Sequence, residues 1–199
     1  MFRIINLGLV LKIVVFISIV FTVFVYSSIK EHFFPDWGLV KLLTVSSLVS
    51  MIVLYIFLIP SCARKIWGLV QKIKNIYPDL NGVWVGHVII ESGVEINVRA
   101  IIRQNLLLTE LDMHGETVKS ITLESTPTIE QGQKKLYYVY RSTPKDPSRQ
   151  PYDGSTLLDV IENENSLKLS GKYYTDRGTV GRISLKQVSK NSQTDVSYY

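Results

Sequence analysis

The sequence predicts a membrane-anchored all-β protein, in which a two-helix transmembrane hairpin is followed by an eight-stranded antiparallel up-and-down β-barrel. Three observations support this fold class. Two long apolar runs without charge lie within the first 60 residues. From Val83 onward the hydrophobic period changes from about 3.6 to 2, which marks a change from helix to strand. Turn signals then recur between short strand-like segments.

Residues 1–60 are interpreted as the transmembrane hairpin, with spans at about 8–29 and 39–60. Ile13–Ile29 and Leu42–Pro60 contain no charged residue. A bilayer core of about 30 Å requires roughly 17–25 helical residues, so each run is long enough to cross it. In lipid the backbone must satisfy its own hydrogen bonds, which favours helices.

Small polar residues form a notch on each span. Ser18 and Thr22 are four residues apart in the first span, and Ser46 and Ser50 have the same spacing in the second. Such notches allow helices to approach closely. They either pack the two helices of one hairpin or join hairpins of different protomers, and the sequence leaves both open.

Cations indicate the orientation of the hairpin. They flank the two spans on the same side, at Arg3, Lys12, Arg64, Lys65, Lys72 and Lys74. In the connecting turn, Lys30 and Lys41 are offset by Glu31 and Asp36. The positive-inside rule therefore predicts that both termini lie in the cytoplasm.

Residues 61–78 predict a basic amphipathic juxtamembrane helix, continuous with the second span, and a linker. Apolar residues recur there at helical spacing between basic ones. A helix of this kind commonly lies against an anionic lipid leaflet. Pro78 and the Asn81-Gly82 pair then favour a turn, which places the domain boundary near residue 79.

Residues 79–190 predict the barrel, and residues 191–199 a flexible polar tail. Eight strand candidates are separated mostly by short turns. They are Val83–Glu91, Glu95–Arg103, Leu106–Met113, Thr117–Ser125, Lys135–Ser142, Ser155–Glu162, Ser166–Thr175 and Thr179–Gln187. Closure into a barrel removes both exposed edges, which favours it over an open sheet or a sandwich. Only the loop at residues 143–151 is long.

Strand alternation predicts which side chains lie inside the barrel. An eight-stranded barrel is filled by side chains or holds one small ligand. The residues assigned to the interior are Trp84, Val88, Tyr138, Leu169 and Ile183. Along the last two strands the inward face becomes polar and aromatic toward the turn at residues 175–179.

Charge and reactive residues argue against several function classes. The formal net charge is +5, but residues 79–199 hold 14 Lys or Arg against 15 Asp or Glu, so long nucleic acid is not an expected partner. His32, His87 and His114 have no metal-ligand spacing, and Cys62 lies at the membrane edge away from any base. We therefore expect neither an enzyme nor a metal protein.

The polar end of the barrel interior predicts a binding site instead. Aromatic faces stack on nucleobases, and an arginine fork suits phosphate. The candidate ligand-binding residues are Tyr140, Tyr152, Tyr173, Thr175, Arg177 and Thr179. Tyrosine is also common in strands as an ordinary packing residue, so each aromatic side chain has an alternative structural role.

Three motifs, together with the paired spans, resemble those of a known family. They are Leu80-x-Gly-x-Trp-x-Gly86, the strand end Tyr138–Pro144, and Gly171-x-Tyr-Tyr-Thr-x-Arg-x-Thr-x-Gly181, of which the last is the most specific. To about Lys186 the chain resembles the two-transmembrane, β-strand-rich effectors of cyclic-oligonucleotide-based anti-phage signalling (CBASS).

The resemblance implies an activating ligand and a mechanism. The barrel would bind a cyclic dinucleotide made by a nucleotidyltransferase after infection, without any other cofactor. Ligand-bound protomers would form homo-oligomers in the lipid bilayer of the bacterial inner membrane and disrupt it, killing the infected cell (abortive infection). By motif, the binding role is carried over to Tyr173, Thr175, Arg177 and Thr179.

Two alternatives from other classes remain. The first is a membrane-anchored, lipocalin-like carrier or sensor of an apolar ligand, which would have an apolar cavity along the whole barrel. The second is a structural membrane scaffold whose aromatic residues are core.

Overall fold

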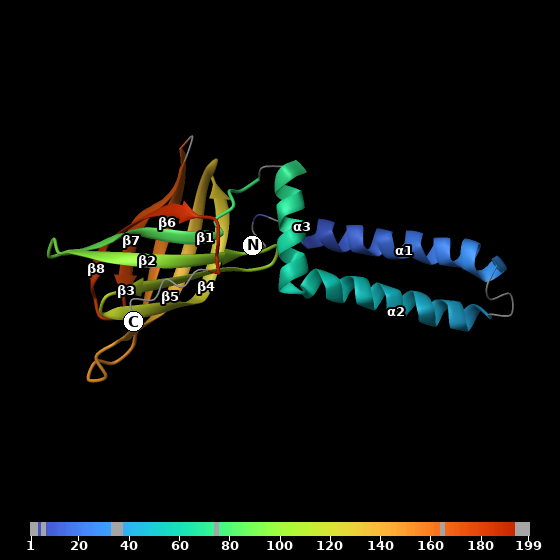
Figure 1. Ribbon diagram of the computed structural model, residues 1–199, viewed down its shortest axis with the longest axis horizontal. Coiled ribbons are helices and arrows are strands. Elements are labelled where there is room, and N and C mark those ends of the chain that lie inside the picture. The colour runs from blue at the N-terminus through green and yellow to red at the C-terminus, as the bar shows by residue number, and fades with distance from the viewer. Residues whose placement is uncertain (1–3, 5–6, 33–37, 74–75, 164–165, 194–199) are drawn as a thin grey trace.

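The computed structural model describes residues 4, 7–32, 38–73, 76–163 and 166–193. Within these residues three helices precede eight strands, and the strands close into a barrel (Figure 1). Two helices run side by side away from the barrel, and the third stands between them and the barrel. The molecule thus has a helical end and a barrel end. Most of the predicted tail, 194–199, lies outside the described residues.

The two long helices are α1, Leu7–His32, and α2, Leu39–Leu58. No single helix in the described part of the chain has by itself both the length and the hydropathy of a membrane span. Ser47–Ile56 and Pro60–Lys72 meet these criteria only as a bent pair, and Gly8–Phe24 is a shorter apolar helix. Membrane spanning therefore stays a prediction at this point.

A groove between α1 and α2 contains three of the small polar residues predicted to pack the spans. Ser18, Thr22 and Ser50 line this groove. The Thr22 hydroxyl donates a hydrogen bond to the Ser18 carbonyl oxygen at 2.8 Å, within its own helix. The side chain of Ser46 lies outside the part of the chain that the structure describes.

Helix α3, Pro60–Ile73, is a separate helix and not a continuation of α2. The axes of Ser47–Ile56 and Pro60–Lys72 differ in direction by 77°. Proline lacks a backbone N–H and has a fixed φ, so it is accommodated in a first helical turn but breaks a helix interior. This corrects the sequence-based expectation of one continuous helix through residues 61–77.

The eight-stranded antiparallel barrel is confirmed. Its strands are β1 Gly82–Ile90, β2 Glu95–Gln104, β3 Thr109–Gly115, β4 Val118–Glu130, β5 Gln133–Pro144, β6 Tyr152–Asn163, β7 Ser166–Thr175 and β8 Val180–Ser189. Each pairs with the next in chain order, and β8 pairs with β1 to close the barrel. The up-and-down order follows from the short connections between consecutive strands.

One strand boundary differs markedly from the sequence-based prediction. The fourth candidate was expected to end at Ser125, but β4 continues through Pro127 to Glu130 and meets β5 at the Gln131-Gly132 turn. Proline is normally confined to strand edges because it cannot donate to a ladder. Among the described residues, β3 pairs with β4 at Met113–Ser120 and His114–Lys119, whereas Pro127 is paired with Leu136 on β5.

Helix α3 covers one end of the barrel, which we call the base. Ala63 and Trp67 are buried and belong to the same apolar cluster as Leu80, Trp84 and the barrel core. Trp84 donates from its indole nitrogen to the Leu80 carbonyl oxygen at 2.9 Å. The apolar face of α3 that carries Ala63 and Trp67 therefore packs against the barrel. Because these side chains are buried there, they are not available to lipid.

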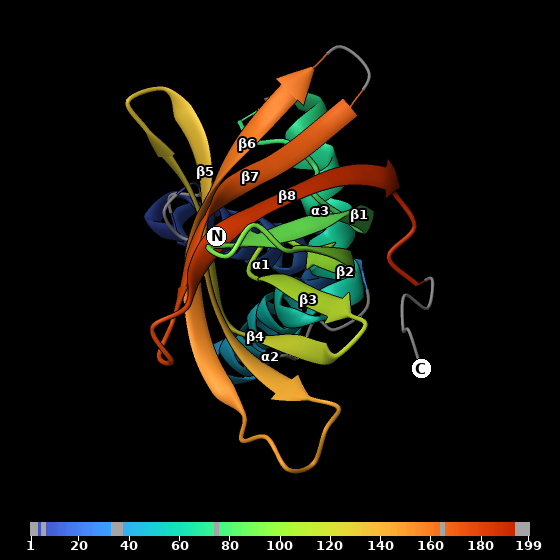
Figure 2. The same ribbon diagram turned by 90° about the vertical axis from the view of Figure 1, so that its left-hand side faces the viewer.

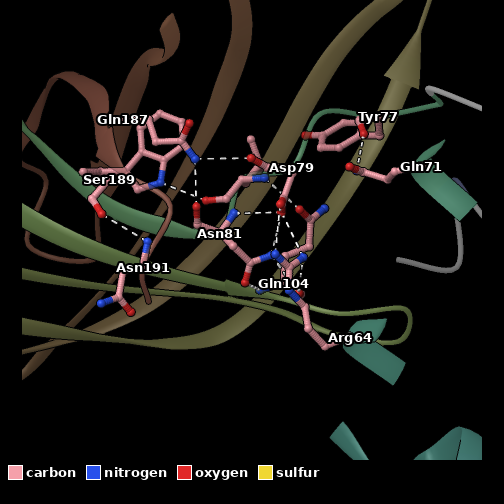
Figure 3. Close-up of polar contacts among 11 residues, drawn as sticks. Arg64, Gln71, Tyr77, Asp79, Asn81, Gln104, Gln187, Ser189 and Asn191 are labelled. Atoms are coloured by element: carbon pink, nitrogen blue, oxygen red, sulfur yellow. Dashed lines mark hydrogen bonds and ion pairs between the residues drawn. The ribbon is translucent and has the colours of Figure 1, made fainter. Parts of the chain in front are cut away.

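Polar side chains hold α3 and the linker against the base (Figure 3). Arg64 donates to both carboxylate oxygens of Asp79, at 3.0 and 2.9 Å. Asn81 exchanges hydrogen bonds with the backbone of Gln104, whose side-chain oxygen accepts from the Leu80 N–H. Gln187 donates to the carbonyl oxygens of Asp79 and Asn81. Helix, linker, β2 and β8 are thus connected at one place.

Replacing Asp79 by asparagine is expected to lower stability at neutral pH and to weaken its pH dependence. Burial raises the pKa of Asp79, but hydrogen bonds from Arg64 and Asn81 outweigh burial and hold the pKa below its usual 3.8. Such a carboxylate stabilises the fold above its unfolded-state pKa, and this contribution is lost as the pH falls through the folded-state value. We expect Asp79→Asn to lower the free energy of unfolding by about 2 kcal/mol at pH 7.

The measurement is unfolding of the full chain in detergent, followed by tryptophan fluorescence between pH 7 and pH 3. The matched control is Asp159→Asn on β6, where the carboxylate is exposed and little change is expected. The difference between wild type and Asp79→Asn should shrink as the solution is acidified below the usual carboxyl pKa. A difference that stays constant would contradict this assignment.

Candidate functional site

A cavity of about 310 Å³ opens at the end of the barrel opposite α3, which we call the mouth. Figure 2 views the barrel from this end, with the helices behind it. All eight strands contribute to the wall. The lining residues are Val88, Ile90, Ile96, Val98, Met113, Gly115, Thr117, Val118, Ser120, Tyr140, Ser142, Pro144, Arg149, Tyr152, Tyr173, Thr175, Arg177, Thr179 and Ile183.

The structure brings all six candidate ligand-binding residues together in this cavity. They are Tyr140, Tyr152, Tyr173, Thr175, Arg177 and Thr179. Of the residues assigned to the barrel interior, Val88 and Ile183 also line it, while Trp84, Tyr138 and Leu169 are buried without lining it. The barrel interior is therefore filled at the base and hollow at the mouth.

The cavity has two chemically different walls. The wall formed by β1, β2, β3 and β8 is mainly apolar and carries Val88, Val98 and Ile183. The facing wall, from β4 to the β7–β8 turn, carries hydroxyl groups, tyrosine rings and two arginines. Alternation along each strand selects these side chains, because only every second residue faces inward. The cavity suits a ligand with an apolar ring face and polar edges.

Two glycines make room for the tyrosine rings. Gly154 on β6 is opposite Tyr140 on β5, and a Cβ at Gly154 would lie 2.4 Å from Tyr140 Cζ. Gly181 on β8 is opposite Tyr173 on β7, and a Cβ there would lie 2.5 Å from Tyr173 Cε1. Because glycine has no side chain, each ring lies flat across its neighbouring strand. The rings are thereby held as rigid surfaces at the cavity wall.

Both phenols remain neutral. Burial, and then proximity to Tyr152 and Tyr173, raises the pKa of Tyr140 above its usual value. Burial and Tyr152 likewise raise the pKa of Tyr173. Tyr140 also stacks on the deeper Tyr138, with ring centroids 5.0 Å apart and planes at 27°. The site therefore presents uncharged aromatic faces backed by a second ring.

Positive charge lies at the rim. The Arg177 guanidinium lies over the Tyr152 ring, 4.5 Å from its centroid, and donates to the Gln150 carbonyl oxygen. Arg149, in the loop between β5 and β6, also lines the cavity and pairs with Asp146 at 3.5 Å. Both arginines are exposed, so each can bind an anion without losing a buried partner.

The residues on either side of Arg177 have structural roles in the turn between β7 and β8. The Thr175 N–H donates to the Thr179 carbonyl oxygen at 3.0 Å, and the Thr179 N–H donates to the Thr175 hydroxyl at 3.1 Å. Gly178 has a φ of 74°, a conformation that favours glycine. Thr175 and Thr179 therefore shape the turn that presents Arg177 to the cavity.

Four polar residues that line the cavity were not among the candidates predicted from the sequence: Thr117, Ser120, Ser142 and Arg149. Arg149 had a usable signal, because it lies in the only long loop that the sequence predicts, and long loops often carry function. Ser120 and Ser142 are small, buried strand residues that line the cavity. Alternation alone cannot distinguish them from packing residues, because their role depends on which strands are neighbours.

Within the described residues, no group of three or more His, Cys, Asp or Glu side chains could hold a metal ion. The polar groups of the cavity are hydroxyls and guanidinium groups. These groups are suited to hydrogen bonding and to holding an anion.

A closed β-barrel with an aromatic, arginine-rimmed cavity at one end belongs to the class of small-ligand receptors. The model of the family described as Cap15, cyclic dinucleotide receptor domain, matches residues 75–187, and the chain belongs to this family. It is also similar to CD-NTase-associated protein 15 of Staphylococcus schleiferi, with 33% identity over 101 residues. That alignment covers 49% of this chain and spans about half, 53%, of the relative.

Replacing Gly154 by alanine is expected to destabilise the mouth of the barrel. The added methyl group would overlap the Tyr140 ring, and relief requires Tyr140 to move into the cavity. Overpacking of this kind costs about 1–3 kcal/mol. Denaturant unfolding of the full chain in detergent measures the loss in free energy of unfolding.

The matched control is Gly68→Ala in α3, because a Cβ there would have no atom within 4 Å. Alanine also has the higher helix propensity, so this variant should be as stable as wild type or more stable. Equal stability of Gly154→Ala and wild type would show that the close contact with Tyr140 does not constrain the site.

Proposed function

We propose that this protein is a CBASS effector that binds a cyclic dinucleotide in the mouth cavity and responds by disrupting the inner membrane. One observation carries the proposal: Tyr140, Tyr173 and Arg177 meet in a single cavity. That cavity lies within the region that matches Cap15 cyclic dinucleotide receptor domains. The proposed activity is ligand binding without catalysis. The ligand is proposed to be made by a nucleotidyltransferase.

In the proposed complex, one base stacks on Tyr140 or Tyr173. Stacking of a base on an aromatic side chain contributes about 1–3 kcal/mol and tolerates different bases. The phosphates lie at the rim, where Arg177 and Arg149 come from two different loops. A cyclic dinucleotide carries two phosphate groups, so two separated arginines match its charge. The apolar wall contacts the ribose and the other face of the base.

Membrane anchoring is proposed for α1 and α2. Their described surfaces expose many large apolar side chains, including Phe16, Phe24, Val40, Met51 and Tyr55. Contiguous apolar surface of this extent marks a contact with protein or lipid. We propose an inner-membrane hairpin with both termini and the barrel in the cytoplasm, where a nucleotide messenger can reach the mouth.

Ligand binding must be coupled to the helices for an effector to act. Helix α3 is fastened to the base by Trp67 and by the Arg64–Asp79 pair, so a movement of the barrel carries the helices with it. A ligand shifts assembly only if the assembled state binds it more tightly. We propose that liganded barrels form homo-oligomers and that this gathers their hairpins in the membrane.

The lipocalin-like alternative is less well supported. It requires an apolar cavity along the barrel, whereas the base is filled by buried side chains such as Trp84, Leu136 and Leu169. The cavity at the mouth also has arginines at its rim, which an apolar ligand does not need. A fatty acid is nevertheless a useful negative probe in the binding experiments.

Replacing Arg177 by alanine is expected to weaken cyclic dinucleotide binding by at least about tenfold, because a hydrogen bond to a charged group contributes roughly 1.5–3 kcal/mol. Calorimetry of the full chain in detergent measures this change. The probes are the cyclic dinucleotides of adenine, guanine, uracil and cytosine, with oleate as the apolar probe.

Arg182→Ala is the matched control, because Arg182 is an exposed arginine on β8 that does not line the cavity. It should bind as wild type does, and both variants should keep the wild-type melting temperature. Unchanged affinity of Arg177→Ala would refute its assignment. Binding of oleate alone would favour the lipocalin-like function.

Cyclic dinucleotide is expected to make lipid vesicles leak when the full chain is present. Purified protein is reconstituted into vesicles of phosphatidylethanolamine and phosphatidylglycerol that contain a self-quenched dye. Addition of the tightest-binding cyclic dinucleotide should release dye, whereas the Arg177→Ala variant should release little at the same ligand concentration. Ligand binding without leakage would separate recognition from membrane disruption and contradict the second half of the proposal.

A further inference from the structure

Two serines face each other inside the cavity. Ser120 on β4 is opposite Ser142 on β5, and their hydroxyl oxygens are 2.7 Å apart. Their side chains line the cavity, yet the residues are only 2% and 1% exposed. Groups this deeply buried can be reached only by a ligand that enters the mouth.

The hydrogen-bonding capacity of this serine pair is not used up. Each hydroxyl has one proton and can also accept hydrogen bonds. In the bond between them one serine donates and the other accepts, so the proton of the accepting serine must find another partner. Among the described residues, the bond between Ser120 and Ser142 is the only hydrogen bond of either hydroxyl. The remaining proton is therefore available to an acceptor in the cavity.

The position of the pair relative to Tyr140 indicates which part of a ligand it meets. Ser142 is two residues from Tyr140 on the same face of β5, one step nearer the mouth. A base that stacks on the Tyr140 ring therefore presents an edge toward this wall. Ser120 is in turn opposite Met113 on β3, so the pair borders the apolar wall as well.

The acceptor must be uncharged. Burying an ion costs far more than burying a neutral polar group, and one neutral donor does not compensate a phosphate. The exposed arginines at the rim are better partners for phosphate. Carbonyl oxygens and ring nitrogens of nucleobases are neutral acceptors that one hydroxyl can satisfy.

We propose that Ser120 and Ser142 select the base, by donating a hydrogen bond to an acceptor atom on the edge of one nucleobase of the bound cyclic dinucleotide. This inference rests on the proposed function and assigns specificity within its site. Tyr140 stacks on any base, because every base has an aromatic face. The serine pair distinguishes bases, because a buried donor left without a partner penalises the wrong one.

The test is calorimetry with the full chain in detergent and the cyclic dinucleotides of adenine, guanine, uracil and cytosine. Wild type should prefer one of the four. In the double variant Ser120→Ala/Ser142→Ala the affinity for that preferred ligand should fall roughly tenfold, while the other three change by less than about threefold. The preference among bases thus disappears while the ability to bind remains.

Ser125→Ala is the matched control. Ser125 is also a buried serine of β4, but it does not line the cavity. Its variant should keep the wild-type order of affinities. If the double variant has a lowered melting temperature, Ser142→Cys keeps the side-chain volume with a weaker donor and should reduce the preference in part.

Different results would overturn the role of the serine pair and the proposed function. An unchanged order of affinities in the double variant, or an equal loss for all four ligands, would overturn the role of the serine pair and leave the proposed function intact. A wild-type protein that binds none of the four would overturn the proposed function and this inference with it.

Discussion

The burial of Trp67 between α3 and the base of the barrel is the interaction on which the rest of the structure depends. Trp67 is fully buried, and it joins Ala63, Leu80 and Trp84 in one apolar cluster. Removing a buried side chain of this size typically costs about 3–5 kcal/mol. The base is filled in this way, and the cavity of the barrel lies toward the mouth.

The same packing attaches the helices to one end of the barrel, the base. Arg64 and Asp79 add a paired hydrogen bond beside Trp67, so α3 is attached by both apolar and ionic contacts. The cavity lies at the opposite end of the barrel from this attachment. The stacked Tyr140 and Tyr138 rings, with centroids 5.0 Å apart, extend from the cavity into the filled core of the barrel.

The aromatic and the charged side chains of the cavity lie on different kinds of backbone. Tyr140 on β5 lies against Gly154 of β6, and Tyr173 on β7 lies against Gly181 of β8, so strand neighbours hold both rings in place. Arg149 and Arg177 are on connections between strands, where side chains can adjust to a charged ligand. The aromatic surfaces of the cavity therefore lie in the barrel wall, and its positive charges lie at the rim.

The sequence by itself determined the all-β class of the second part of the chain, because alternation with period two is a local property. It also predicted six candidate ligand-binding residues, and all six line the cavity. It did not show that β4 passes through Pro127, because a proline is tolerated there only where the neighbouring strand has ended. The sequence also did not show that the apolar face of α3 packs against the barrel, because an apolar stripe is equally compatible with contact with lipid.

Tertiary structure alone decided where the cavity ends, that Arg149 reaches it, and that Ser120 meets Ser142. The contact between Ser120 and Ser142 joins residues 22 positions apart and depends on the register between β4 and β5. Periodicity assigns a side chain to one face of a strand, but only closure of the barrel decides which side chains share a layer. For that reason the sequence predicted a ligand-binding end of the barrel, and the fold showed which side chains line the cavity there.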